Sequence, residues 1–139
     1  MKKLTTQATI TSFTNQTSEN SIIQSVIAFI NSDNLACEKI NDIQTALSEA
    51  INNVFSFAYP NKQGKVSVSI SIYDNKVLKL KVRDYGCGIG DIARARDPLF
   101  TTDKERSGMG FTVMESFSDK LTVKSTIGKG TIVTMEFQM

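Results

Sequence analysis

Two polar side chains, Glu49 and Asn53, are the first candidates for chemistry in this chain. A spacing of four residues places them on the same side of a helix. An asparagine oxygen suits Mg²⁺, which prefers oxygen ligands and commonly shares its coordination shell with phosphates. A glutamate one turn earlier could take the proton from a hydroxyl or water that attacks a phosphate. The simpler alternative is that both side chains belong to a solvated helix face.

A glycine-rich segment after an alternating apolar run is the second candidate. Asp84 ends the run, and Gly86, Gly88 and Gly90 follow it. A carboxylate beside a flat apolar slot can accept a hydrogen bond from the exocyclic amine of adenine. Glycines there would let the backbone approach the base, because no β-carbon intrudes. The segment is not a Walker A loop, since no Gly-Lys-Ser/Thr follows it. Taken alone, it could also be an ordinary glycine turn.

The third candidate is Ser107-Gly108-Met109-Gly110-Phe111, which is expected to open a helix. Backbone amides and the helix dipole favour anions at a helix N-terminus. The polar loop 97–106 before it could close over a bound phosphate. Lys104 and Arg106 in that loop could neutralise phosphate charge, the arginine through a bidentate contact. Ordinary solvated loop charges are the alternative.

Two amphipathic helices and two hairpins must position these candidates. Apolar residues recur at helical spacing over about 19–31 and 38–56. The period then changes to two, which predicts a hairpin over 66–82 and a second one over 121–137. In the last strand, either Ile132 or Val133 continues the apolar face.

Two weaker elements complete the expected fold. Residues 6–13 could form an edge strand, and a short helix is expected from Gly108 to about Ser118. One-faced antiparallel strands need a cover, and amphipathic helices supply it. We therefore predict an α/β two-layer sandwich, in which a mostly antiparallel sheet is covered on one face by helices.

Composition limits the possible function classes. A length of 139 residues fits one domain, 1–139, and a net charge of +2 is too small to indicate nucleic acid or a membrane as the main partner. No signal peptide and no membrane-spanning apolar run is evident, so we expect a cytoplasmic protein. The chain has no histidine, which excludes a Ser-His-Asp triad, a histidine-ligated zinc site and a phosphorylated histidine.

The order of these parts along the chain is more specific than any one of them. It resembles the ATP-binding superfamily of gyrase, Hsp90, histidine kinases and MutL, whose fold is of the Bergerat type. Within it, the chain is similar to the sporulation anti-sigma-F factors, a family of bacterial serine-protein kinases, from about Thr9 to Phe137. The segments that carry this similarity are Ser48-Glu49-Ala50 with Asn53, Val82-Arg83-Asp84-Tyr85-Gly86-Cys87-Gly88-Ile89, Pro98-Leu99-Phe100-Thr101-Thr102, and Glu105-Arg106-Ser107-Gly108-Met109-Gly110-Phe111-Thr112-Val113-Met114-Glu115.

The resemblance implies an ATP site with Mg²⁺. Glu49 would be the general base, Asn53 the Mg²⁺ ligand, and Asp84 the acceptor of the adenine amine. The other implied nucleotide contacts are Gly86 and Gly88 along the base, Arg106 at the γ-phosphate, Ser107, Gly108, Met109 and Gly110 at the phosphates, and Thr131 near the adenine.

The resemblance also implies partners. Such proteins bind a sigma factor, here of the sigma-F type, and keep it from RNA polymerase. They also phosphorylate a serine of a small anti-anti-sigma protein, and they are typically homodimers. No direct contact with nucleic acid or membrane is expected.

Three alternatives and three departures accompany this interpretation. The chain could be a nucleotide-gated protein that sequesters a sigma factor without useful kinase activity, a stress-response anti-sigma kinase, or the ATPase domain of a sensor histidine kinase. The loop between Thr102 and Arg106 is about two residues shorter than expected, and Gln24 stands near the place where relatives carry a basic residue. The stretch 54–59 lacks a His-Gly pair that often occurs there, which should change packing more than chemistry.

Overall fold

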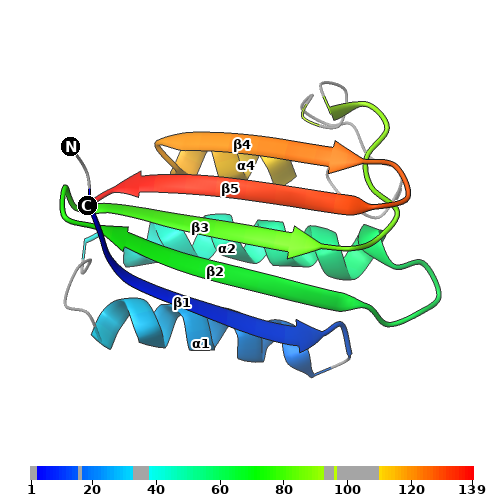
Figure 1. Ribbon diagram of the computed structural model, residues 1–139, viewed down its shortest axis with the longest axis horizontal. Helices are drawn as coiled ribbons and strands as arrows, with labels where there is room; N and C mark the ends of the chain where they lie inside the picture. The colour runs from blue at the N-terminus through cyan, green and yellow to red at the C-terminus, as the bar shows by residue number, and fades with distance from the viewer. Residues whose placement is uncertain (1–2, 16, 33–37, 93–95, 97–109) are drawn as a thin grey trace.

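The computed structural model describes residues 3–15, 17–32, 38–92, 96 and 110–139. They form two layers, with helices packed on one face of a β-sheet (Figure 1). The sheet has five strands in the order β1-β2-β3-β5-β4, and neighbouring strands are antiparallel. The predicted sandwich is therefore confirmed. Its elements are β1 (Leu4–Phe13), α1 (Ser18–Ser32), α2 (Ile40–Asn53), the π-helical segment η1 (Val54–Ala58), β2 (Lys65–Tyr73), β3 (Val77–Asp84), α4 (Gly110–Phe117), β4 (Lys120–Thr126) and β5 (Gly130–Gln138).

The alternating strand residues form one wall of the core, as the period of two predicts. In β2 the buried side chains are Val66, Val68, Ile70 and Ile72. In β5, where either Ile132 or Val133 was expected to face the core, Val133 is the buried residue and is 6% exposed. The helices form the other wall, with Ile22, Val26 and Ile30 from α1, Ile43, Leu47 and Ile51 from α2, and Met114 from α4.

The second helix differs from its expected form. We predicted one helix over 38–56, whereas the α-helix ends at Asn53 and a π-helical turn continues to Ala58. Val54 and Ala58 are both buried, so this turn extends the apolar face of α2 toward the end of β3. π-Helical turns are rare and often occur at functional sites.

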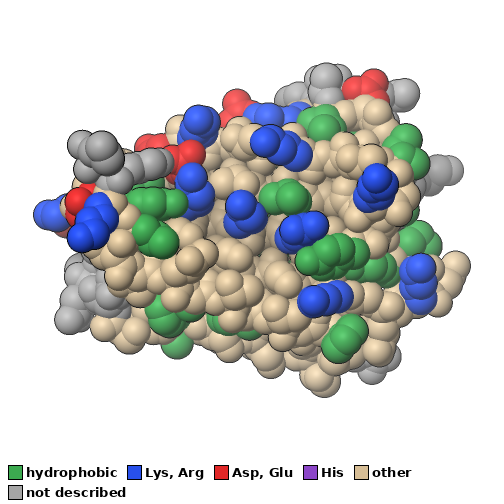
Figure 2. All heavy atoms as spheres, in the orientation of Figure 1, with side chains coloured by type: hydrophobic (Ala, Val, Ile, Leu, Met, Phe, Trp, Pro, Cys, Tyr) green, Lys and Arg blue, Asp and Glu red, His purple; other side chains and the backbone are tan. Residues whose placement is uncertain are grey.

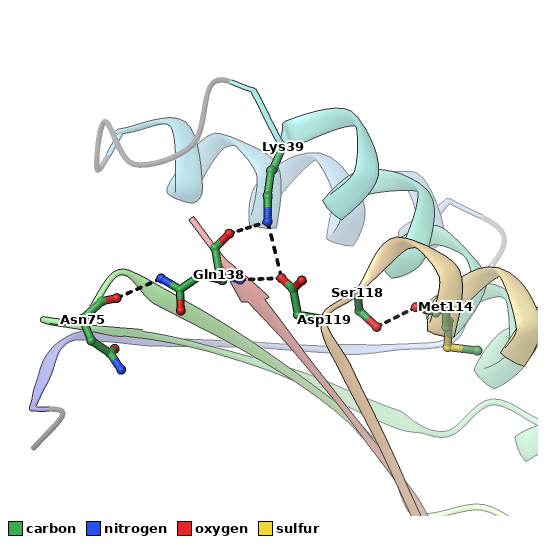
Figure 3. Close-up of polar contacts among 6 residues, drawn as sticks. All are labelled: Lys39, Asn75, Met114, Ser118, Asp119 and Gln138. Carbon is green, nitrogen blue, oxygen red and sulfur yellow. Dashed lines mark hydrogen bonds and ion pairs between the residues drawn. The ribbon is translucent and has the colours of Figure 1, made fainter.

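At its N-terminal end, α2 is connected to the sheet by Lys39, the residue that precedes the helix (Figure 3). The Lys39 ammonium donates to the backbone carbonyl of Gln138 and lies 3.4 Å from the Asp119 carboxylate. Asp119 in turn accepts the backbone N–H of Gln138 at 2.6 Å. The residue before α2 thus contacts the end of β5 and the residue before β4.

The opposite face of the sheet is open and rich in basic side chains, as Figure 2 shows. Its outward positions include Lys79, Lys81 and Arg83 on β3 and Lys120 and Lys124 on β4. The net charge of +2 is therefore unevenly distributed over the molecule. Among the helices that the structure describes, none is long and apolar enough to cross a bilayer.

Candidate nucleotide-binding site

Asp84 ends β3 as a buried carboxylate, with only 7% of the residue exposed. Its Oδ1 accepts the backbone N–H of Gly86 at 2.9 Å and that of Thr131 at 3.3 Å. Burial raises the pKa of Asp84 above its ordinary value, and the two N–H donors offset part of that rise. Both of these bonds, from residues that the structure describes, end on Oδ1. The structure therefore brings the predicted site residues Asp84, Gly86 and Thr131 together.

The glycines beside Asp84 are required by close backbone contacts within the chain. A β-carbon on Gly86 would lie 2.1 Å from the carbonyl oxygen of Ala58. On Gly88, which has φ +79°, it would lie 2.4 Å from the carbonyl oxygen of Thr126. The atom closest to each position belongs to the protein backbone, and the predicted contact of these glycines with a base stays a prediction. Their absent side chains allow the loop to sit tightly between η1 and the β4–β5 turn.

Hydrogen bonds on both sides hold this glycine loop in place. The Cys87 N–H donates to the Ala58 carbonyl at 2.9 Å, and the Cys87 carbonyl accepts the Gly128 N–H at 2.9 Å. The Ile89 N–H donates to Ser125 Oγ at 2.7 Å. Ser125 Oγ also lies 2.8 Å from the Thr131 hydroxyl. Sequence reasoning missed Ser125, because a serine in an outer strand carries no signal until the register of β4 and β5 is known.

Tyr59 is a second residue that sequence reasoning missed. Its phenol oxygen accepts the backbone N–H of Tyr85 at 2.7 Å and donates to the Lys65 carbonyl at 2.5 Å. Tyr85 directly follows Asp84 in the chain. A single hydroxyl therefore joins the end of η1, the start of β2 and the start of the glycine loop.

Glu49 and Asn53 meet the first residue of α4. A β-carbon on Gly110 would lie 3.3 Å from Asn53 Oδ1 and 3.4 Å from Glu49 Oε2. Both side chains are partly buried. The third predicted segment thus reaches the first one at Gly110. The other residues predicted to contact phosphate, Arg106, Ser107, Gly108 and Met109, lie outside the described residues, as does Lys104.

An open hollow of about 430 Å³ extends from Glu49 along α2 toward its N-terminus. Its described lining is uncharged apart from Glu49 and consists of Asn41, Gln44, Thr45 and Ser48. In the part of the chain that the structure describes, no three His, Cys, Asp or Glu side chains cluster closely enough to hold a metal ion. The Asn53 oxygen would suit a Mg²⁺ ion that shares its coordination shell with ligand phosphates, which is its common mode of binding.

Comparison with protein families matches residues 14–137 to the histidine kinase-like ATPase domain. The anti-sigma F factor of Caldanaerobacter subterraneus subsp. tengcongensis is 52% identical over 100 residues, which cover 70% of this chain and 69% of that protein. The anti-sigma F factor of Geobacillus stearothermophilus is 46% identical over 114 residues, 80% of this chain and 77% of that protein.

Solved structures show the same fold. The RsbU and RsbW domains of Rv1364c from Mycobacterium tuberculosis superpose with a TM-score of 0.71 at 15% identity, over 96% of this chain and 32% of that one. A histidine kinase domain from Erythrobacter litoralis has a TM-score of 0.59 at 18% identity, over 86% of this chain and 60% of that one.

The matched range 14–137 includes nearly all of the described elements, from α1 to β5. The chain belongs to the anti-sigma F factor family and carries that family's histidine kinase-like ATPase domain.

Proposed function

We propose that the chain binds ATP with Mg²⁺, uses it to phosphorylate a serine of an anti-anti-sigma protein, and holds a sporulation sigma factor of the sigma-F type. The family assignment supports the ATP-dependent and anti-sigma parts of this proposal. The observation that carries the catalytic part is the meeting of Glu49 Oε2 and the Asn53 amide at Gly110, the N-terminal residue of α4.

The proposed site has one end that would bind the adenine base and another that would bind the phosphates. At the base end, the buried Asp84 carboxylate would accept the adenine amine, beside Gly86, Gly88 and Thr131. At the phosphate end, the N-terminus of α4 at Gly110 would favour the negative charge of the phosphates. We propose Arg106, Ser107, Gly108 and Met109 as further phosphate contacts, since they directly precede Gly110 in the chain.

Glu49 is proposed to take the proton of the acceptor hydroxyl. Its Oε2 lies within 3.4 Å of the β-carbon position of Gly110, so it faces the place where the phosphates would sit. Asn53, one helical turn later, would hold Mg²⁺, which supplies neutralisation of phosphate charge when it is bound. Phosphoryl transfer depends mostly on positioning and charge stabilisation. A chain without histidine can therefore perform it with Glu49 as its base.

A sharp test compares Glu49→Gln with the wild type. The protein is mixed with labelled ATP, magnesium and a purified anti-anti-sigma protein. Glu49→Gln should keep ATP affinity within about twofold, yet transfer label at least about a hundredfold more slowly, the usual size of a lost general base. The matched control is Glu38→Gln, an exposed glutamate just before α2, which should transfer at the wild-type rate. Equal transfer by Glu49→Gln and wild type would refute the base assignment.

The same experiment separates the alternatives. A wild-type chain that binds ATP and a sigma factor, yet labels no serine, would be a nucleotide-gated sequestering protein. Glu49 favours the kinase, because binding alone needs no base beside the phosphates. Testing sporulation and stress-response sigma factors in parallel identifies the partner class. Sedimentation of the purified chain tests the proposed homodimer.

A further inference from the structure

Tyr59 lies at the junction between the π-helical turn η1 and the chain that leads into β2. Its ring packs flat against Gly64, where a β-carbon would come within 2.1 Å of the ring. Gly64 is itself fixed, since its N–H donates to Thr14 Oγ1 at 3.1 Å and its carbonyl accepts the Thr14 N–H at 2.9 Å. The tyrosine ring therefore lies against a hydrogen-bonded backbone segment, which limits the positions that its hydroxyl can take.

Three successive amides of the glycine loop have hydrogen-bond acceptors, and the Tyr59 hydroxyl is the acceptor of the first. The Tyr85 N–H donates to Tyr59 Oη, the Gly86 N–H to Asp84 Oδ1, and the Cys87 N–H to the Ala58 carbonyl. Two of the three acceptors come from the end of η1. The last carbonyls of a helix have no partner within it, and here the loop amides use one of them.

We propose that Tyr59 is a positioning residue for adenine recognition, an inference that rests on the proposed ATP site. Its hydroxyl fixes the peptide between Asp84 and Tyr85, and thereby the direction of the Asp84 carboxylate. The phenol can do so because it is both acceptor and donor: it accepts the Tyr85 N–H and donates to the Lys65 carbonyl.

The ionisation of the phenol is consistent with this role. Burial raises the pKa of Tyr59 above its ordinary value of 10.0, and the negative charge of Asp84 raises it further, against the opposing effect of the Tyr85 N–H. The hydroxyl therefore keeps its proton at neutral pH and can continue to donate to Lys65.

The test uses Tyr59→Phe in the full chain, with ATP and inosine triphosphate as ligands. Inosine replaces the exocyclic amine of adenine by a carbonyl, so the ratio of the two affinities reports the contact with Asp84. Tyr59→Phe should weaken ATP binding by roughly tenfold, the size of one well-placed hydrogen bond, and should bring the ATP and inosine triphosphate affinities closer together. Tyr73→Phe, at the other end of β2, is the matched control and should change neither affinity.

A double-mutant cycle with Asp84→Asn separates positioning from a merely structural role. If Tyr59 acts through Asp84, then Tyr59→Phe should have little further effect on ATP affinity in the Asp84→Asn background. Amide exchange provides a local readout: the Tyr85 N–H should exchange faster in Tyr59→Phe.

Two results would overturn the role of Tyr59. One is a Tyr59→Phe variant whose Tyr85 amide exchanges faster while its ATP affinity and its preference over inosine triphosphate equal those of the wild type. The other is full additivity in the cycle. A wild type that binds no ATP would instead overturn the proposed function, and the positioning role with it.

Discussion

The carboxylate of Asp84 at the end of β3 accepts the backbone N–H of Thr131, near the start of β5, at 3.3 Å. Strands β3 and β5 are neighbours in the sheet although a long stretch of chain separates them. The register of this strand pair brings Asp84, the candidate adenine acceptor, to Thr131, which only the family resemblance indicated as a site residue. The same register sets the tight contact between Gly130 and the backbone of Asp84.

Replacing Asp84 by asparagine should weaken nucleotide binding without unfolding the chain. The amide oxygen can still accept from Gly86 and Thr131, whereas its NH₂ group would face the adenine amine. We expect ATP affinity to fall by more than about tenfold, as for the loss of a charged hydrogen bond. Calorimetric titration measures this change, and Asp74→Asn, in the exposed β2–β3 turn, is the control. Unchanged affinity in Asp84→Asn would contradict the adenine contact.

The raised pKa of Asp84 predicts a pH-dependent stability difference between wild type and Asp84→Asn. A folded-state pKa above the ordinary 3.8 means that Asp84 contributes stability below that pH and loses it as the pH rises through the raised value. The free energy of unfolding of Asp84→Asn should therefore rise relative to that of the wild type toward neutral pH. The difference between the two should shrink on acidification. Urea unfolding of ligand-free protein from about pH 4 to pH 7 measures it. A gap that widens on acidification would show the opposite sign of shift.

Gly130 and Gly128 form a matched pair for testing the contact with Asp84. Both have positive φ, +122° and +80°, so an alanine strains the backbone at either position. A β-carbon on Gly130 would lie 2.1 Å from the Asp84 carbonyl oxygen, whereas one on Gly128 would meet nothing within 4 Å. Gly128→Ala should lower the free energy of unfolding by about 1 kcal/mol. Gly130→Ala should lower it by at least about 2 kcal/mol and also weaken ATP binding. Equal effects in thermal unfolding would show that the Asp84 contact is unimportant.

The Lys39–Asp119 contact should stabilise the chain modestly and with the opposite pH dependence to Asp84. The Gln138 N–H, and after it Lys39, lower the pKa of Asp119, so its contribution is present above pH 3.8 and lost as the pH falls through the lowered value. Because both side chains are substantially exposed, we expect Asp119→Asn to reduce unfolding free energy by at most about 1 kcal/mol at neutral pH. Denaturant titrations at neutral and acid pH measure this change, and ATP affinity should stay at the wild-type value.

Much of the fold followed from hydrophobic period alone. Val66 to Ile72 alternate and form a strand with one buried face, and Ile43, Leu47 and Ile51 recur at helical spacing and face the sheet. These patterns are local, because the direction of each side chain follows from its own backbone conformation. The spacing of Glu49 and Asn53 predicted their shared helix side for the same reason.

Other features depended on contacts between distant segments. The π-helical form of 54–58 has no distinct apolar period, and the role of Tyr59 requires that Lys65 and Tyr85 lie on either side of its hydroxyl. The glycines at 86 and 88 were recognisable as unusual, but the backbone atoms they approach belong to Ala58 and Thr126.

The sequence by itself determined which residues could do chemistry, the elements that carry them and, by the order of its motifs, the family. Only the tertiary structure decided that Glu49 and Asn53 meet Gly110. It also decided that Thr131 donates to Asp84 and that Tyr59 accepts the N–H of the residue after Asp84. The physical reason is that hydrophobic period specifies the face of an element, whereas strand order and register decide which faces and backbone groups meet across the fold.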